Sequence, residues 1–331
     1  MARILCDGRW TGPHGIGRFA RNVLSRLPEH TQLKSGPRPL SPLDPLWLSY
    51  QIAALRPSVF FSPGFNVPVV SARPLVITIH DLIHIQFPAF ATFGRRLYYR
   101  FLVRPTAARA VCVLTGSEYS RTQILKWSGL PEARVVNISY GVESIFHPDG
   151  PRYEPGYPYI LYVGNFRAHK NLNRLFAAFA QVDHPELQLI LTGDKTPELA
   201  ARLQALKLQG RVQFAGTISD EVLSRLYRGA TSLMLPSLLE GFGLPALEAI
   251  ACGTPVIASR TTALPEVVAD AGVLIDPLDI DDMRRAIERV IGNADLRRRM
   301  RSAGLARARQ FSWNCVAERV QRAICQAAHS V

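Results

Sequence analysis

Short apolar runs alternate along the chain with stretches whose apolar residues recur at the helical period. This alternation is typical of βαβ units, in which parallel strands are joined by helices. The last long stretch, residues 281–328, has the helical period alone and predicts helices that close the fold. The apolar runs predict strands at residues 3–6, 59–61, 75–79, 110–114, 159–163, 187–191, 211–214, 233–235 and 255–258.

Residues 146–158 interrupt the alternation because they are rich in proline and glycine and have no clear period. The 331 residues suffice for two domains of ordinary size. We therefore expect two Rossmann-like, doubly wound α/β domains, residues 1–150 and 151–331, whose last helix could cross back to the first domain. Ligands of such sheets bind beyond the carboxyl ends of the strands, so two facing domains would enclose a cleft.

Composition narrows the class of protein. Hydrophobic residues make up 47% of the chain and charged residues 20%, which indicates a globular protein and excludes a disordered one. No apolar stretch approaches the roughly 18 residues of a membrane-spanning helix, and the apolar start is too short for a signal-peptide core. We expect a cytoplasmic protein. Its five cysteines are widely spaced without a Cys-x-x-Cys pair, which fits reduced thiols and predicts no metal site.

The formal net charge is +13, and most of the excess lies in the N-terminal half. Such a charge attracts nucleic acid, anionic lipid or phosphorylated substrates, but no recognised nucleic-acid module accompanies it, so nucleic acid is not expected. Within residues 93–105, arginines recur every four residues at Arg96, Arg100 and Arg104, beside an apolar face. This helix could lie on an anionic membrane, or its apolar face could belong to the core.

The most informative stretch, residues 236–259, predicts a strand, a glycine loop, a helix, a glycine stop and a second strand. Pro245 suits a first helical turn, and Gly253 suits the position after the last turn. Amides at a helix N-terminus favour a phosphate or a sugar hydroxyl, and those expected here belong to Gly241, Phe242, Gly243 and Leu244.

Two acids flank that loop. Glu240 precedes the predicted helix and Glu248 lies one turn inside it, so each carboxylate could contact a different part of one ligand. A carboxylate accepts hydrogen bonds from two hydroxyls, as the diols of ribose or a hexose offer them. Taken singly, either acid could instead be solvated on an ordinary capped helix.

The sequence Glu-Gly-Phe-Gly-Leu-Pro, with a second glutamate eight residues after the first, closely resembles the donor signature of the GT4 retaining glycosyltransferases, which have the GT-B fold. The resemblance covers essentially the whole chain. It implies an N-terminal acceptor domain, a C-terminal nucleotide-sugar domain and transfer with retained configuration, without a metal or other cofactor. Further segments that follow the family's order are residues 12–18, 78–82, 115–120, 140–142, 162–172 and 264–268.

The resemblance also assigns roles in the C-terminal half. It implies that Glu248 binds the ribose, Glu240 the donor sugar, and the loop amides the sugar hydroxyls and phosphate. Lys170 would neutralise the leaving diphosphate and stabilise charge that develops in the transition state. Asn165 stands where the family usually has an arginine. Arg167 is the nearest cation, and it could grip the diphosphate bidentately or be solvated.

In the N-terminal half, Gly15 and Gly17 would let the first loop approach the donor phosphate or the acceptor closely. This loop lacks the Gly-x-Gly-x-x-Gly pattern of a nicotinamide dinucleotide site. His80 and Asp81 end a predicted strand, where sites collect. A lone histidine there is usually structural, but the family has a donor-contacting histidine at this position.

The segments 80–83 and 164–171 most resemble bacterial mannosyltransferases. The resemblance therefore implies transfer of a hexose, first of all mannose from GDP-mannose, to a saccharide acceptor in cell-surface polysaccharide synthesis. The acceptor could be carried on polyprenyl diphosphate, with the enzyme peripheral at the inner face of the plasma membrane. Two alternatives stay open, a nucleotide-sugar epimerase on the same fold and a noncatalytic scaffold that binds nucleotide sugars.

Overall fold

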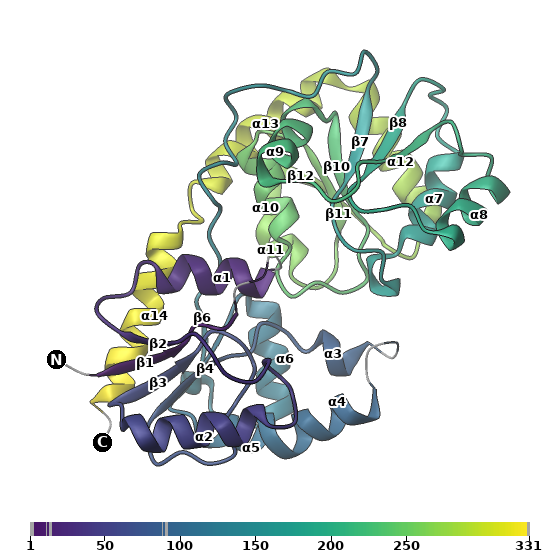
Figure 1. Ribbon diagram of the computed structural model, residues 1–331. Helices are drawn as coiled ribbons and strands as arrows, with labels where there is room; N and C mark the ends of the chain where they lie inside the picture. Colours follow the sequence, from purple (N-terminus) through teal and green to yellow (C-terminus); the bar gives the residue numbers. More distant parts are fainter. Residues whose placement is uncertain (1–2, 11, 13–14, 88, 90–91, 330–331) are drawn as a thin grey trace. The chain divides into compact units, whose positions relative to one another are not determined.

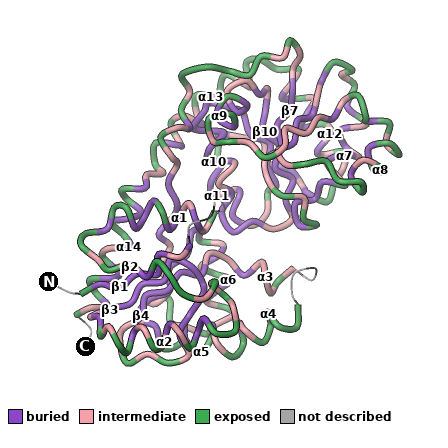
Figure 2. Tube along the Cα trace, in the orientation of Figure 1, coloured by how far each residue is buried: buried purple, intermediate pink, exposed green. Residues whose placement is uncertain are grey.

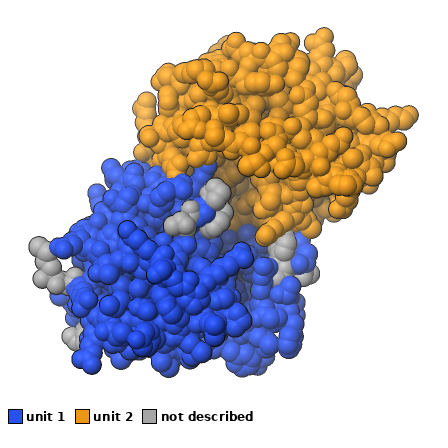
Figure 3. Space-filling view, viewed as in Figure 1, with its two compact units in different colours: residues 1–141, 312–331 blue, residues 142–311 orange. Residues whose placement is uncertain are grey.

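The computed structural model describes residues 3–10, 12, 15–87, 89 and 92–329, which form two compact units (Figures 1 and 3). Unit 1 comprises the chain up to Gly141 and again from Ser312, and unit 2 is Val142–Phe311. In the described residues each unit has one parallel sheet of six strands, as the α/β prediction requires. No helix in these residues is both long and apolar enough to cross a membrane.

The sheet of unit 1 has the strand order β2-β1-β3-β4-β5-β6, so the order reverses between β1 and β3. Its strands are β1 (Ile4–Asp7), β2 (Thr31–Leu33), β3 (Val59–Ser62), β4 (Leu75–Thr78), β5 (Cys112–Thr115) and β6 (Val135–Asn137). Its helices are α1 (Gly15–Leu24), α2 (Asp44–Leu55), α3 (Ile83–Gln86), α4 (Phe93–Tyr98), the π-helix η1 (Tyr99–Val103), α5 (Arg104–Arg109), α6 (Glu118–Ser128), the short η2 (Glu132–Arg134) and α14 (Trp313–Ala328).

The sheet of unit 2 has the order β12-β11-β10-β7-β8-β9 and reverses between β7 and β10. Its strands are β7 (Tyr159–Tyr162), β8 (Gln188–Leu191), β9 (Val212–Phe214), β10 (Ser232–Leu235), β11 (Val256–Ser259) and β12 (Gly272–Ile275). Its helices are the short η3 (Ala168–Lys170), α7 (Leu172–Ala180), α8 (Pro197–Ala205), α9 (Asp220–Gly229), α10 (Leu244–Ala251), α11 (Leu264–Val268), the short η4 (Ala269–Ala271), α12 (Ile280–Gly292) and α13 (Ala294–Ala308).

All nine predicted strands are present, and three others, β2, β6 and β12, were not predicted. Each of these three lies at the edge of its sheet. Their residues are partly exposed, whereas β1, β3, β4, β5, β7, β10 and β11 are buried throughout (Figure 2). An edge strand therefore leaves a weaker apolar run in the sequence than a central one.

The division between the units differs from the predicted boundary at residue 150, because it falls after Gly141. The proline-rich segment has no regular structure, but it is bound to α9 of unit 2. Arg228 Nε donates a hydrogen bond to the Pro151 carbonyl (2.7 Å), and the Tyr153 amide donates to the Arg225 carbonyl (3.1 Å). A proline-rich composition thus marked irregular chain and not the end of a unit.

The last helix, α14, belongs to unit 1, although the residues that precede it in the sequence belong to unit 2. Its first residue, Trp313, packs so closely on Gly141 that a Cβ there would lie 2.6 Å from the indole ring. Arg319 Nη1 donates to the Ile138 carbonyl (3.3 Å), and Arg26 Nε donates to the Asn314 side chain (2.9 Å). Contacts with α1, β3, β4 and β5 show that α14 covers one face of the sheet.

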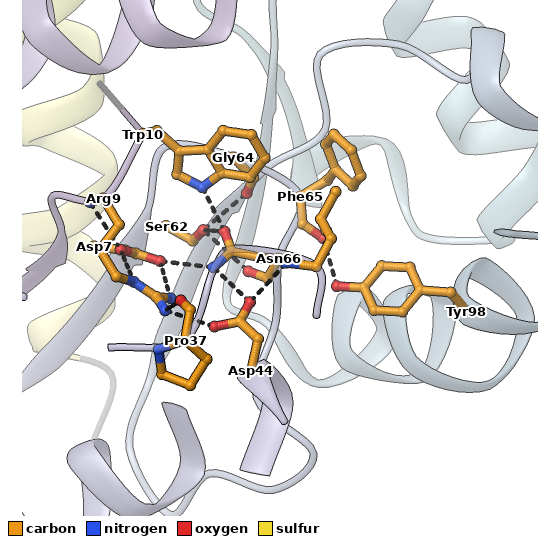
Figure 4. Close-up of polar contacts among 11 residues, drawn as sticks. Asp7, Arg9, Trp10, Pro37, Asp44, Ser62, Gly64, Phe65, Asn66 and Tyr98 are labelled. Atoms are coloured by element: carbon orange, nitrogen blue, oxygen red, sulfur yellow. Dashed lines mark hydrogen bonds and ion pairs between the residues drawn. The ribbon is translucent and has the colours of Figure 1, made fainter. Parts of the chain in front are cut away.

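At the reversal in unit 1, buried polar side chains meet at the strand ends (Figure 4). Arg9 donates to both carboxylate oxygens of Asp7, at 2.8 and 2.7 Å, and its Nη1 lies 2.7 Å from Asp44 Oδ1. Asn66 Nδ2 donates to Asp7 Oδ2 (2.6 Å), and Trp10 Nε1 donates to Asn66 Oδ1 (2.6 Å). Burial by itself lowers the pKa of Arg9, but its bonds to the two carboxylates raise that pKa overall.

Candidate active site

In unit 2 the candidate catalytic residues follow the two strands at which the sheet order reverses. Lys170 lies in the loop after β7, and Glu240 lies in the loop after β10. Because β7 and β10 are parallel neighbours, their carboxyl ends meet at one edge of the sheet. That edge at the reversal is where doubly wound sheets bind their ligands.

Lys170 and Glu240 form a buried ion pair. Lys170 Nζ lies 2.6 Å from Glu240 Oε1, and the two side chains are only 11% and 10% exposed. Ser237 Oγ donates a further hydrogen bond to the same carboxylate oxygen (2.7 Å). The ammonium group is thus held in a fixed position by a carboxylate that is itself hydrogen-bonded.

The two loops that carry this pair are also tied by their backbones. The Leu238 amide donates to the His169 carbonyl (2.7 Å), and Asn171 Nδ2 donates to the Pro236 carbonyl (3.0 Å). The same Asn171 amide group also donates to the Pro277 carbonyl (2.6 Å). Asn171 is left-handed (φ +63°) and lies between η3 and α7, so one residue turns the chain and fixes both loops.

The glycine loop and the helix after it have the predicted form. Gly243 is the N-cap of α10 with φ +105°, makes no side-chain cap, and is followed by the proline of the first turn. A Cβ at Gly243 would lie 2.6 Å from the Leu264 side chain, so glycine is required twice over. Gly253 follows the helix with φ +77°, as predicted.

Glu248 is buried on α10, with 4% exposure. Tyr227 of α9, which is fully buried, donates its hydroxyl to Glu248 Oε2 at 2.9 Å. The Tyr227 ring packs edge-on against Phe146, and its backbone carbonyl accepts a hydrogen bond from the Thr254 hydroxyl (2.5 Å). The carboxylate of Glu248 is therefore oriented by a side chain that is itself fixed.

Thr262, in the loop after β11, has a left-handed backbone with φ +62°. A β-branched residue is rare in this region, where its backbone is strained. Its Oγ1 accepts a hydrogen bond from the Glu240 amide at 3.2 Å. The strained threonine thus fixes the backbone of the acid that pairs with Lys170.

Asn165 and Arg167 are exposed in the loop after β7. Asn165 Oδ1 accepts a hydrogen bond from the Arg167 amide (3.2 Å), and its carbonyl accepts one from the Tyr162 hydroxyl (2.7 Å). Asn165 therefore shapes a local turn that carries Arg167. At position 165, where the family usually has an arginine, this chain therefore has an asparagine that stabilises the turn.

The other predicted site residues lie in unit 1. Both ring nitrogens of His80 are engaged, since Nε2 is 2.9 Å from the Pro63 carbonyl oxygen and Nδ1 pairs with the Tyr140 hydroxyl. Phe19 meets the His80 ring edge-on at 5.2 Å. The His80 ring is therefore held by its own unit.

Asp81 follows His80, and its Oδ1 accepts a hydrogen bond from the Ile83 amide (2.9 Å) at the start of α3. Gly15 is the first residue of α1. A Cβ at Gly17 would lie 1.9 Å from the Gly12 carbonyl oxygen, so this glycine allows a close approach of the chain to itself. Pro13 and His14 of the same motif lie outside the described residues.

Comparison with known proteins identifies the family. The model of the glycosyl transferases of group 1 matches residues 147–307. The O-antigen chain mannosyltransferase B of Escherichia coli is 31% identical over 294 residues, which cover 84% of this chain and 77% of that protein. The chain belongs to the group 1 glycosyltransferases.

Two further relatives match this glycosyltransferase over a smaller share of their own length. The MMP alpha-(1->4)-mannosyltransferase of Mycolicibacterium hassiacum is 36% identical over 262 residues, which cover 74% of this chain and 63% of that protein. The serotype-specific mannosyltransferase WbdA of Escherichia coli is 27% identical over 277 residues, and the match spans only 33% of its length. The epimerase and scaffold alternatives are not favoured by these relatives.

Solved structures show the fold of the glycosyltransferase. Anabaena Alr3699/HepE, solved in complex with UDP-glucose, matches with a TM-score of 0.80 at 19% identity, over 98% of this chain and 100% of that one. WaaG, a glycosyltransferase involved in lipopolysaccharide biosynthesis, matches with a TM-score of 0.76 at 17% identity, over 97% and 99% of the two chains. Both units therefore belong to one GT-B fold.

Three residues around the candidate site of the glycosyltransferase were not predicted from its sequence. Tyr227 had a signal, since it shares the buried face of α9 with Leu223 and Leu226 and ends in a polar group. Ser237 and Thr262 had none, because serine and threonine in loops are common and their contacts depend on the tertiary fold.

Proposed function

We propose that this glycosyltransferase transfers mannose from GDP-mannose to a saccharide acceptor, with retention of configuration, in the synthesis of a cell-surface polysaccharide. The observation that carries the proposal is the buried pair of Lys170 and Glu240 at the reversal of the unit 2 sheet, beside the N-terminus of α10. The relatives named as mannosyltransferases support the choice of sugar.

Unit 2 binds the donor in this proposal. Glu248, oriented by Tyr227, accepts hydrogen bonds from the ribose hydroxyls. Glu240 contacts hydroxyls of the donor sugar. The diphosphate and remaining sugar hydroxyls bind the amides at the start of α10, where the helix dipole favours negative charge; these amides belong to Gly241, Phe242, Gly243 and Leu244.

Transfer of the sugar in this proposal depends on stabilising the charge of the leaving diphosphate and uses no nucleophile from the enzyme. The bond between the anomeric carbon and the diphosphate oxygen breaks, and its electron pair leaves with the diphosphate. The acceptor hydroxyl oxygen then bonds to the anomeric carbon on the same face, and its proton passes to a diphosphate oxygen. Lys170 stabilises the negative charge that develops on the leaving group, and its fixed position means that little reorganisation is needed.

The remaining predicted residues take supporting roles. Arg167 adds a second cation to the diphosphate from the turn that Asn165 shapes. In unit 1, which binds the acceptor, His80 and Asp81 contact the donor side of the reaction. The loop with Gly15 and Gly17 approaches the substrates. The acceptor saccharide is carried on polyprenyl diphosphate, and the positive charge of the N-terminal half supports an anionic carrier.

Nucleotide binding tests the donor. Thermal unfolding of the purified protein is measured with GDP, UDP, ADP and their sugar conjugates, each near 100 times its dissociation constant, where binding adds about 2.7 kcal/mol. We expect stabilisation by GDP and GDP-mannose that is lost in Glu248→Ala. Stabilisation by UDP or ADP alone would contradict the choice of base.

Transfer itself tests the role of Lys170. Lys170→Ala should lower kcat about a hundredfold or more with GDP-mannose and a membrane-derived acceptor, because the cation acts on the transition state. Lys195→Ala, which removes an exposed lysine of the same unit, should leave the rate unchanged. Unimpaired transfer by Lys170→Ala would rule out the electrostatic mechanism, and conversion of the donor without acceptor would indicate an epimerase.

A further inference from the structure

Exposed apolar side chains are concentrated in unit 1. Of the eleven large apolar side chains that are exposed in the described part of the chain, eight lie in this unit. Most of them belong to two helical segments, α2 with the residue before it and α4 with η1 after it. They are Leu43, Leu46, Tyr50, Phe93, Leu97 and Phe101, with exposures of 67, 59, 68, 78, 37 and 63%.

Helix α2 is apolar on both sides. From Pro45 to Leu55 it contains no charged residue. Leu48 and Ile52 are buried against the unit, while Leu46 and Tyr50 lie exposed on another side. Apart from Asp44, Ser49 and Gln51 the side chains of α2 are apolar. A helix with apolar residues on opposite sides is normally buried, so the exposed side of α2 needs a covering that the described chain does not supply.

The α4 and η1 segment has the same character with added charge. Tyr99 and Val103 are its buried residues, whereas Phe93, Leu97 and Phe101 recur every four residues on the exposed side. The expectation that the apolar face of residues 93–105 belongs to the core is therefore wrong for Leu97 and Phe101, whereas Tyr98 and Leu102 of that face are half-buried. The π-helix and α5 continue the segment and bury Thr106 and Ala107.

Arginines accompany the exposed rings. Arg96, Arg100 and Arg104 are exposed, and among the described residues none of them has a carboxylate partner. Arg100 lies over the Phe101 ring, 5.5 Å from its centre. Between Pro45 and Ser117 the chain has one acidic residue, Asp81, against seven arginines. Arginine beside exposed aromatic rings is the combination that binds the surface of an anionic bilayer.

The two segments are joined into one face by the chain between them. The Val70 amide donates to Ser49 Oγ on α2 (3.2 Å), and Arg109 of α5 donates to the Val69 carbonyl (2.9 Å). The Tyr98 hydroxyl of α4 donates to the Phe65 carbonyl (3.3 Å). Helices α2, α5 and α4 accordingly lie along one side of unit 1 in Figure 1.

We infer that this face of α2, α4 and η1 docks on the surface of an anionic lipid bilayer, with arginines at the phosphates and the exposed rings among the head groups. A protein that bound this face would have to offer acidic groups and apolar side chains side by side. An anionic bilayer offers phosphate groups and apolar chains together. The inference extends the proposed function, since a polyprenyl-linked acceptor is met at a bilayer and docking would bring unit 1 to it.

The test is sedimentation of the full-length protein with vesicles, without donor or acceptor. Vesicles of phosphatidylcholine with about one third phosphatidylglycerol should bind the protein, and vesicles of phosphatidylcholine alone should not. Added salt should weaken the binding, because it screens the arginines. Equal binding to both kinds of vesicle, or none to either, would overturn the inference.

Variants separate the two parts of the face. Phe93→Ser with Phe101→Ser, Leu46→Ser with Tyr50→Ser, and Arg96→Glu with Arg100→Glu should each weaken vesicle binding about tenfold or more. The matched control, Val222→Ser with Leu278→Ser, changes exposed apolar residues of unit 2 and should bind like the parent. Thermal unfolding without nucleotide, measured on every variant, checks that unit 1 remains folded. Stabilisation by nucleotide keeps failure of docking distinct from failure of the proposed donor site. Parent-like vesicle binding by all three patch variants would contradict the inference.

Discussion

The ion pair of Lys170 and Glu240 is buried, and a buried ion pair adds little to the stability of the fold. Removing two charges from water costs about as much as their attraction returns, so buried pairs seldom stabilise a fold. Both side chains are nearly inaccessible, and Ser237 and Thr262 add hydrogen bonds around the acid. Such an arrangement is better explained by a need for a fixed cation than by a need for stability.

Tyr227 offers a prediction at the same scale. Tyr227→Phe removes the hydrogen bond to Glu248 and leaves the ring in place, so the carboxylate loses its orientation. Hydrogen bonds to charged groups contribute about 1.5–3 kcal/mol, which predicts a rise of about tenfold or more in the dissociation constant for GDP. Titration calorimetry measures the constant, and KM for the donor should rise more than kcat falls.

The control for Tyr227 is Tyr153→Phe, which removes the hydroxyl of a partly exposed tyrosine in the same unit. It should bind GDP like the parent. If Tyr227→Phe also binds GDP like the parent, Tyr227 only packs in the core and does not position Glu248.

At the scale of elements, the central strands and the loop-helix unit around α10 were predictable because local sequence determines them. Buried strands such as β7 and β10 are continuous apolar runs, and Pro245 and Gly253 mark the ends of α10. Of the edge strands, β9 was predicted, whereas β2, β6 and β12 were not, because half-exposed residues weaken the apolar run. Nor could the ties between loops, since Asn171 reaches Pro236 across 65 positions of sequence.

Helix α13 illustrates the same limit. Its arginine-rich sequence resembles an exposed charged helix, but three arginines satisfy carbonyl groups at the ends of other helices. Arg297 Nη1 donates to the Val290 carbonyl at the end of α12 (2.7 Å), and Arg301 Nη1 donates to the Gly253 carbonyl after α10 (3.1 Å). Arg307 Nε donates to the Val267 carbonyl of α11 (3.3 Å). Only the tertiary fold distinguishes such capping from solvation.

At the scale of the whole molecule, the chain leaves unit 1 at Gly141 and returns to it at Ser312, so unit 2 is continuous in sequence and unit 1 is not. Removing residues 312–331 should therefore unfold unit 1 and spare unit 2. The helix α14 buries a full row of apolar side chains at about 1.5–3 kcal/mol for each large one, as much as the whole stability of a typical domain. These side chains are Trp313, Val316, Ala317, Val320, Ala323, Ile324 and Ala327.

Calorimetry and limited proteolysis measure the result. The shortened chain should show one unfolding transition, and GDP should still raise its midpoint temperature because the proposed donor site lies within unit 2. Proteases should leave a resistant fragment close to residues 142–311, because unit 2 stays folded. Glu318→Ala, an exposed change on α14 in the full chain, should preserve the parent's behaviour. If GDP no longer stabilises the shortened chain although unit 2 remains folded, nucleotide binding requires unit 1 as well, and the assignment of the donor to unit 2 alone is wrong.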